Sequence, residues 1–340
     1  MSFYTNVHCL GDNILFRGIS NDGQRFKDRV EYHPTLYIPT KEETKFRTLE
    51  GKPVGEIQPG TIRECRDFIR KYKDVDNFNI YGNDKFEYSF IAEYFPEEHI
   101  EYDFSQIRVA YLDIETGSEN GFPNIETANE EVTAITFKIS NELYVFGRNE
   151  FVNKREDVYY FRFDSERALL EKFFHLWDTK SPDVVTGWNI ETFDIPYLVN
   201  RAKRLFDEKK NPYRLLSPWR KINVFTLFGL GGQELQAYDI IGIETLDYFS
   251  MYRKFIYINQ ESYRLDHIAF VELGEHKLDY SEQGSLHLLY KNDYQKFIEY
   301  NIKDVELVEQ LEEKLKLIEM VVSLAYLCKV NYGNTFGQVR

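Results

Sequence analysis

RVAYLDIET, residues 108–116, is a nearly continuous apolar run that ends in two acids, Asp113 and Glu115. This pattern is typical of a strand that is buried on both faces of a sheet. Residues two apart in a strand point to the same face, so the two carboxylates should project together. Adjacent acids at the edge of an apolar strand repel each other and lose hydration unless a positive group lies between them. By itself the pair fits solvated strand-end acids as well as it fits a cation site.

The sequence after this strand mixes further strands with helices. In chain order the segments are strands VTAITFKI (132–139) and ELYVFG (142–147), helix SERALLEKFFHLW (165–177), strand DVVTGW (183–188) and helix DIPYLVNRAKRL (194–205). Asp164 or Ser165 is a natural N-cap for the first helix. Strands mixed with amphipathic helices predict an α/β fold, a sheet with helices on its faces.

Residues 222–247 indicate a β-hairpin around Gly229, Gly231 and Gly232, followed by a strand in IETLDYF (243–249). The remainder is expected to be helical, at roughly 262–273, 284–297 and 299–327. Residues 1–105 differ, because short aromatic and β-branched runs are joined by an Asn21-Asp22-Gly23 hairpin turn and followed by a helical pattern at 61–75 and a strand-like stretch at 77–82. They predict a separate, smaller α+β domain.

Length and composition limit the function classes. A chain of 340 residues suggests two domains, with three possible. A formal charge of −14 argues against general coating of nucleic acid, but metal ions can supply positive charge where an enzyme grips a few nucleotides. Three scattered cysteines favour reduced thiols in the cytoplasm and neither a disulfide framework nor a zinc site. We expect no signal peptide and no membrane span, because basic starts and long apolar runs are missing.

Two more acidic motifs stand out. Asp194, in TGWNIETFDIPY, is placed as a helix N-cap, a role that would be purely structural. Asn189 and Phe193 precede it in a loop suited to a base edge and a stacked ring. Tyr300 and Asp304, in IEYNIKDVELV, are four apart on a helix and share one face, as a tyrosine packed beside a surface acid would. Each motif alone favours the structural interpretation.

Together the four carboxylates favour a metal site. Mg²⁺ and Mn²⁺ prefer carboxylate oxygens to sulfur or imidazole. Two such ions, about 3.5–4 Å apart, can align the attacking water and the leaving oxygen of a phosphodiester. This arrangement needs about four carboxylates from separate elements, which a strand, a helix start and a helix face provide. No zinc spacing among the seven histidines competes.

The order D-I-E-T, N-x-x-x-F-D and Y-N-x-x-D resembles the three exonuclease motifs of family B DNA polymerases, in the version with Tyr in the third motif. The likeness is greatest to the replicative polymerases of T-even-type bacteriophages, and it extends over VEYHPTLYIP, LDYFSMYRKF and LIEMVVSLAYLCKV to nearly the whole chain. It implies an RNase H-like (DEDD-type) 3′-5′ exonuclease domain at 106–315 and an N-terminal domain at 1–105, on which 316–340 packs back.

The resemblance also implies a role for each matching residue. Asp113, Glu115 and Asp304 would bind the catalytic Mg²⁺ or Mn²⁺ ion, and Asp113 with Asp194 would place the second. Glu115 and Tyr300 would orient the attacking water, with Tyr300 as a donor and positioner, since a free tyrosine has a pKa of about 10. Phe122 and Phe193 would stack on the terminal bases of a single-stranded primer 3′ end, with Asn189 beside them. The 222–240 hairpin would help to part primer from template.

This sequence departs from the family in two ways. Thr192 stands where close relatives often have Gly, and the S-L-Y-P-S and D-T-D-S polymerase segments are missing. We therefore expect this chain to carry the proofreading activity, with the polymerase part present as a continuation or as a separate chain. The resemblance to phage polymerases implies that it works in the cytoplasm of a host cell.

Two alternatives remain. One is a binding or assembly module of a split polymerase, in which residues 1–105 bind RNA and nuclease activity is low. The other is a scaffold with a dead nuclease site. The basic segment 200–221 fits a DNA track and a solvated helix face about equally.

Overall fold

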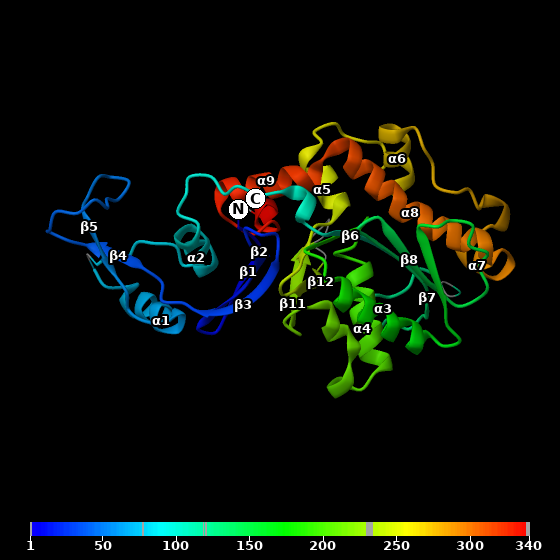
Figure 1. Cartoon of the computed structure of the whole chain (residues 1–340), viewed down its shortest axis with the longest axis horizontal. Helices are drawn as coiled ribbons and strands as arrows, with labels where there is room; N and C mark the ends of the chain where they lie inside the picture. The colour runs from blue at the N-terminus through cyan, green and yellow to red at the C-terminus, as the bar shows by residue number, and fades with distance from the viewer. Residues whose placement is uncertain (1, 77, 118, 120, 229–233, 338–340) are drawn as a thin grey trace. The chain divides into compact units, whose positions relative to one another are not determined.

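A computed structural model of the chain describes residues 2–76, 78–117, 119, 121–228 and 234–337. The chain divides into two compact units (Figure 1). The smaller unit combines the residues up to Asp103 with the segment from Val322 onward, and the larger unit comprises Phe104–Val321. Among the described residues, none of the helices has the length and apolar character that a membrane crossing requires.

The larger unit is built on a mixed six-stranded sheet in the order β13-β10-β6-β7-β8-β9. Its strands are β6 (Val109–Thr116), β7 (Val132–Ile139), β8 (Glu142–Gly147), β9 (Val158–Arg162), β10 (Val184–Thr186) and β13 (Glu244–Thr245). The antiparallel meander β6-β7-β8 forms its centre, and β10 lies parallel to β6. The predicted α/β fold is confirmed.

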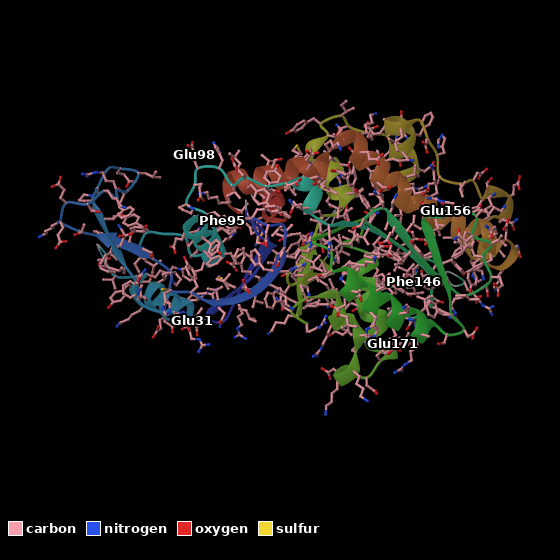
Figure 2. All side chains as sticks on the ribbon, in the orientation of Figure 1. Glu31, Phe95, Glu98, Phe146, Glu156 and Glu171 are labelled. Atoms are coloured by element: carbon pink, nitrogen blue, oxygen red, sulfur yellow. The ribbon has the colours of Figure 1, made fainter. Side chains whose placement is uncertain are left out.

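Helices cover both faces of this sheet (Figure 1). The helices of the larger unit are α3 (Glu166–Lys180), α4 (Asp194–Leu205), α5 (Tyr248–Phe255), α6 (Leu265–Leu273), α7 (Leu286–Asn292) and α8 (Tyr294–Leu315). On one face the side chains of α3 and α4 form a core with Leu112, Ile114 and Phe146, and Figure 2 shows Phe146 inside the packed side chains of this unit. On the other face α8 packs against β6 and β7.

This division decides where the acids of β6 point. Leu112 and Ile114 belong to the core under α3 and α4. Because successive side chains of a strand alternate between faces, Asp113 and Glu115 project to the face that α8 covers. The hydrophobic pattern of the strand therefore fixes the direction of the two carboxylates.

A two-stranded hairpin, β11 (Ile222–Phe228) with β12 (Glu234–Ile240), also belongs to the larger unit. It confirms the two predicted strands, whereas the expected tip at Gly229, Gly231 and Gly232 lies outside the described residues. Short 3₁₀ helices occur at Phe104–Gln106, Glu208–Lys210, Pro212–Leu216 and Ser281–Gln283.

The smaller unit is α+β. Its elements are β1 (Phe3–Leu10), β2 (Asn13–Ile19), β3 (Arg25–Glu31), β4 (Leu36–Pro39), β5 (Val54–Ile57), α1 (Ile62–Tyr72), α2 (Phe86–Tyr94) and α10 (Asn334–Gly337), with α9 (Leu317–Cys328) beginning in the larger unit. The segment from Val322 onward bonds to β1: the Tyr4 hydroxyl donates to the Val330 carbonyl at 2.6 Å, and the Asn331 side chain bonds the backbone of Val7 at 2.9 and 2.6 Å.

Several local predictions are wrong. The strand expected at 243–249 covers only Glu244–Thr245, because the Asp247 side chain accepts a hydrogen bond from Ser250 N and starts α5 at Tyr248. The strand expected at 77–82 is a single bridge between Tyr37 and Tyr81. The long C-terminal helices break at Asp293 and at Lys316 instead of near residue 298, because Asp293 caps α8 and Lys316 adopts a left-handed conformation.

Candidate active site

Three carboxylates meet where β6 passes beneath α8. One oxygen from each of Asp113, Glu115 and Asp304 lies within 4.8 Å of the other two. The i, i+2 spacing on β6 supplies the first two, and the register of β6 against β7 shifts directly after Glu115. This bulge ends the regular pairing at the site, as bulges beside active sites often do.

Helix α8 presents Tyr300 and Asp304 on one face, as the four-residue spacing predicts. Asp304 is only 4% exposed, and its Oδ1 has no hydrogen-bond partner among the described residues. A buried carboxylate oxygen without a partner is costly unless a cation takes that place. The orphaned oxygen is therefore an independent sign of a cation site.

Lys277 is a cation that already touches this cluster. Its ammonium group lies 2.5 Å from Asp304 Oδ2 and donates to the Tyr300 hydroxyl at 3.1 Å. It also stands over the Tyr300 ring, 5.1 Å from the ring centroid. Burial alone lowers the pKa of Lys277, but Asp304, Tyr300 and Asp113 raise it above its ordinary value. Lys277 is therefore a fixed positive charge that offsets only part of the negative charge.

Asn301 orients one of the ligands. Its side-chain nitrogen donates to Asp113 Oδ2 at 2.6 Å, and its oxygen accepts from the Thr136 hydroxyl on β7. Asn301 is fully buried, so the amide is held by its neighbours. The network fixes the rotamer of Asp113 and leaves the other oxygen of that carboxylate available.

Asp194 is the first residue of α4, one position later than the N-cap that was predicted for it, and the N-cap is Phe193. Instead, Asp194 Oδ1 accepts from Ile114 N at 3.0 Å, which ties the start of α4 to β6 between the two acids of that strand. Within the described residues, Asp194 does not join the group of three carboxylates whose oxygens lie within 4.8 Å. The negative charge of Asp194 still raises the pKa of both Asp113 and Glu115.

The carboxyl groups hold protons more tightly than free carboxyls do. Burial, and then the charge of Asp304, raises the pKa of Asp113 well above its ordinary value and that of Glu115 to about 8. Burial also raises the pKa of Asp304, and that of Asp194 to about 7. Burial and Asp304 raise the pKa of Tyr300, so its phenol stays protonated at neutral pH. Such shifts arise from burial and from neighbouring like charges, and they cluster at functional sites.

The loop after β10 is held by a further buried acid, Asp247. It accepts from Glu191 N at 3.1 Å and from Ser250 N at 3.0 Å, and so joins this loop to α5. Asn189 has a φ of 67°, a left-handed conformation that asparagine tolerates better than most residues. Gly187 is required for a different reason: a Cβ atom there would meet the Leu112 carbonyl at 2.5 Å.

The two predicted stacking residues lie against each other. The rings of Phe122 and Phe193 have centroids 5.3 Å apart, and Phe193 stacks on Tyr197 at 5.6 Å. Phe122 is 81% exposed, which is unusual for a phenylalanine in a folded unit. The exposed Phe122 ring, tilted 47° to the Phe193 ring that supports it, offers an apolar surface next to the residue that precedes Asp194.

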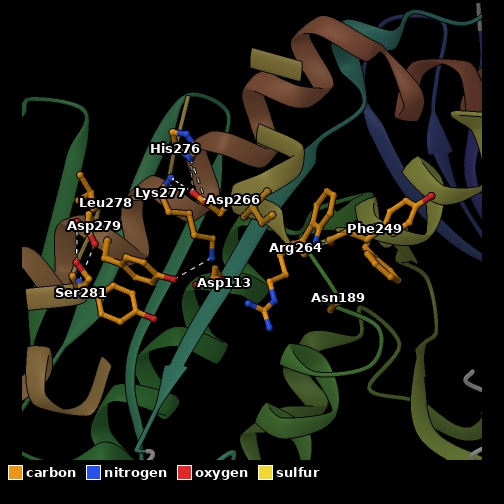
Figure 3. A pocket seen from close by; sticks show the side chains of 15 residues that line it. Asp113, Asn189, Phe249, Arg264, Asp266, His276, Lys277, Leu278, Asp279 and Ser281 are labelled. Atoms are coloured by element: carbon orange, nitrogen blue, oxygen red, sulfur yellow. Dashed lines mark hydrogen bonds and ion pairs between the residues drawn. The ribbon is translucent and has the colours of Figure 1, made fainter. Parts of the chain in front are cut away.

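A cleft of about 1040 Å³ opens in the larger unit at this site (Figure 3). Asp113, Lys277, Tyr300 and Asn189 are among the residues that line it. Figure 3 shows Lys277 reaching toward Asp113 from the segment that carries His276 and Leu278. The described residues that line the cleft do not include Phe122 or Phe193.

The residues present fit a hard divalent cation. Carboxylate oxygens are the ligands that Mg²⁺ and Mn²⁺ prefer, and one of these oxygens is buried with no partner in the part of the chain that the structure describes. Four acids, Asp113, Glu115, Asp194 and Asp304, share one lysine, so the site carries excess negative charge. Positive ions would remove that excess.

Sequence reasoning missed Lys277, Asn301 and Asp247. Lys277 lies in an irregular segment after α6, and no spacing rule connects it with Asp304. Asn301 could have been noticed, because it directly follows Tyr300 in the third motif. Asp247 was assigned to a strand, which concealed its part in fixing the loop of Asn189.

Comparison of the amino-acid sequence with known proteins assigns the chain to a family. Residues 57–268 match the exonuclease domain of DNA polymerase family B. The match includes Asp113, Glu115 and Asp194 and ends before Tyr300 and Asp304. The chain belongs to this family, and most of the matched range, residues 104–268, lies in the larger unit.

The chain is similar to complete polymerases of bacteriophages. It is 32% identical to the DNA-directed DNA polymerase of Escherichia phage RB69 and 30% identical to that of Enterobacteria phage T4, in each case over 99% of this chain and 40% of the relative. The DNA polymerase catalytic subunit of Human herpesvirus 7 (strain JI) is 30% identical over 64% of this chain and 22% of the relative. The chain therefore spans about 40% of the length of the phage relatives.

Proposed function

We propose that the chain is the proofreading part of a family B replicative polymerase and removes nucleotides from the 3′ end of DNA by two-metal-ion hydrolysis. The observation that carries this proposal is the carboxylate cluster of Asp113, Glu115 and Asp304, in which one buried oxygen of Asp304 has no hydrogen-bond partner among the residues described. Family membership supports the reaction type. In this assignment residues 106–315 form a 3′-5′ exodeoxyribonuclease of the DEDD type with Tyr300 in its third motif.

Each site residue then has a definite task. Asp113, Glu115 and Asp304 would hold one Mg²⁺ or Mn²⁺ ion, and Asp113 with Asp194 the second. Ions bound there would lower the pKa of a bound water and stabilise charge on the attacking and leaving oxygens.

Tyr300 would donate a hydrogen bond to the attacking water beside Glu115, because its raised pKa keeps the phenol protonated. Lys277 would hold Asp304 in place and add positive charge near the phosphate. Phe122 and Phe193 would support the terminal bases, because their paired rings, tilted 47° to each other, present apolar surface on which a base can pack.

The remaining assignments follow from the relatives. Residues 1–105 with 316–340 would form the N-terminal domain, and the polymerase part would be a continuation or a partner chain, since the relatives are about two and a half times as long. The substrate would be the single-stranded 3′ end of a primer. Work in the cytoplasm of a bacterial host fits relatives from bacteriophages and three free cysteines.

The test is digestion of a 5′-labelled single-stranded DNA oligonucleotide by the whole chain in Mg²⁺, in Mn²⁺ and in excess EDTA. We expect stepwise shortening from the 3′ end in either metal, none in EDTA and none by the Asp113→Ala variant. Identical digestion by wild type and Asp113→Ala, or no metal-dependent digestion, would refute the enzyme assignment. Tight DNA or RNA binding without hydrolysis would instead favour the binding or assembly module.

A further inference from the structure

The wall of the cleft carries an arginine that the carboxylate chemistry does not use. Arg264 directly precedes α6, and its side chain is exposed. Its backbone nitrogen donates to the Ser262 hydroxyl at 3.3 Å, whereas its guanidinium has no hydrogen bond or ion pair with any described residue. Figure 3 shows this side chain extending into the cleft between Asp113 and Asn189.

The other basic groups that line the cleft are engaged. Lys277 contacts Asp304 and Tyr300, and the His276 ring lies 3.2 Å from the Asp266 carboxylate. Asp266 also accepts from Lys277 N at 2.8 Å. Asp266, two residues after Arg264, is thus already in contact with His276 and Lys277. The Arg264 guanidinium therefore remains available to a ligand from solution.

The surroundings indicate what that ligand is. Asp113, Asp266 and Asp279 line the cleft, so an anionic strand that enters it is repelled along most of its length. A guanidinium is planar, always charged and matched to the oxygens of phosphate. Trp188, Phe249 and Tyr263 line the same part of the cleft, with the Trp188 and Phe249 centroids 5.8 Å apart and those of Phe249 and Tyr263 6.3 Å apart. Aromatic rings beside a cation are typical of surfaces that hold unpaired nucleotides.

We propose that Arg264 binds a backbone phosphate of the substrate strand, on the 5′ side of the linkage that is hydrolysed, and that the aromatic rings beside it receive the adjoining nucleotide. The inference rests on the proposed exonuclease function and deepens it. The scissile phosphate belongs at the carboxylates and Lys277, so the phosphate at Arg264 is a different one. Arg264 is then a positioning residue that sets how much single strand the enzyme must hold.

The test combines Arg264→Ala with single-stranded DNA oligonucleotides in which one non-scissile linkage at a time is a neutral methylphosphonate. With ordinary DNA in Mg²⁺, we expect Arg264→Ala to raise KM about tenfold, the range of one charge-assisted hydrogen bond, and to leave kcat nearly unchanged. The slope of log(kcat/KM) against log salt should become shallower by about 0.7, as for one phosphate contact on a single strand. At one linkage, and only there, the neutral substrate should abolish the difference between variant and wild type.

Arg162→Ala is the matched control, because it removes the same charge from an exposed side chain of the larger unit that pairs with Glu150 outside the cleft. It should change neither KM nor the salt slope. Arg264→Lys should fall between wild type and Arg264→Ala, because it keeps the charge and loses the planar fork. An unchanged KM and salt slope in Arg264→Ala, or an equal penalty at every neutral linkage, would overturn the inference.

Failure of the proposed function would look different. In that case wild type would not hydrolyse DNA in Mg²⁺, whatever residue stands at 264. Anisotropy of a labelled oligonucleotide in Ca²⁺ or EDTA still measures binding without hydrolysis, and Arg264→Ala should weaken that binding about tenfold. Equal binding by the two proteins would remove Arg264 from the site, whether or not the chain is a nuclease.

Discussion

Two of the places where the larger unit buries carboxylates treat them in opposite ways. Glu166 on α3 is paired with Arg201 on α4 through two bonds of 2.7 Å, and the remaining donors of Arg201 reach the carbonyls of Ala128 and Asn129 at 2.9 and 2.8 Å. Glu166 also accepts from Val132 N at 2.8 Å. Every charge there has its partner.

At the candidate active site, by contrast, four acids share one lysine, and an oxygen of Asp304 has no partner among the described residues. A buried acid with a structural role is distinguished from one with a functional role by whether the protein itself balances its charge. Glu166 is balanced by the protein itself and locks the loop before β7 to α3 and α4. The carboxylate cluster is balanced only in part, so we expect both its stability and its chemistry to depend on ions from solution.

The largest expected effect is the loss of hydrolysis on changing Asp194. Losing even an indirect partner of a metal ligand costs roughly 10–100-fold, so Asp194→Ala should lower kcat/KM by more than about a hundredfold. Asp194→Asn, which can still accept from Ile114 N, should be equally inactive, because the lost charge and not the lost hydrogen bond is responsible. Steady-state hydrolysis of single-stranded DNA measures both. Activity within tenfold of wild type in either variant would contradict the role given to Asp194.

Next in size is the cost of breaking the balanced pair. Glu166→Ala leaves Arg201 charged and buried, so the free energy of unfolding should fall by about 3–5 kcal/mol. The double variant with Arg201→Met should recover much of that loss, because no charge remains buried. Urea unfolding followed by tryptophan fluorescence reports on this unit, since Trp177, Trp188 and Trp219 all lie in it. If Glu166→Ala lowers the free energy of unfolding by less than about 1 kcal/mol, the Glu166–Arg201 pair does not stabilise the fold as described, and the contrast with the candidate active site fails.

The unbalanced site should instead respond to pH and to metal. The pKa values of Glu115, about 8, and Asp194, about 7, lie above those of the unfolded chain, so the folded state binds more protons between about pH 4 and 8. In EDTA, the resulting stability should be fully present at about pH 4 and be lost progressively as the pH rises toward 8.

Mg²⁺ or Mn²⁺ should restore that stability most at pH 8, where the carboxylates are ionised without having to release protons. Thermal unfolding across this pH range, with metal and with EDTA, measures the effect. A metal-induced rise in Tm that is as large at pH 5 as at pH 8 would show that these carboxyl groups do not titrate as described.

The smallest effect is expected at Tyr300. Tyr300→Phe removes the bond from Lys277 and the hydrogen bond that we propose Tyr300 donates to the attacking water, but none of the proposed metal ligands, so kcat should fall about tenfold and leave measurable activity. Thermal stability in EDTA should stay close to that of wild type. A loss as complete as that of Asp194→Ala would mean that Tyr300 does more than position.

Sequence reasoning reached the parts of this site that rest on regular periodicity. The period of two on β6 places Asp113 with Glu115, and the helical spacing on α8 places Tyr300 with Asp304. It did not reach Lys277, because an irregular segment has no period and its path depends on contacts such as that of Lys277 N with Asp266. The strand predicted at 243–249 was wrong because the apolar residues of IETLDYF fit the spacing of a helix as well as that of a strand. The Asp247 cap starts helix α5 at Tyr248 and so ends the strand early.

The amide of Asn301 has a consequence for ion selection. It already occupies Oδ2 of Asp113, so this carboxylate has only its other oxygen readily available to a cation. Ca²⁺ often takes both oxygens of a carboxylate in a roomy, irregular shell, whereas Mg²⁺ demands a compact octahedron. Asn301 would then act as a filter for ionic size, and Asn301→Ala should let Ca²⁺ compete better with Mg²⁺ in hydrolysis assays that titrate one ion against the other.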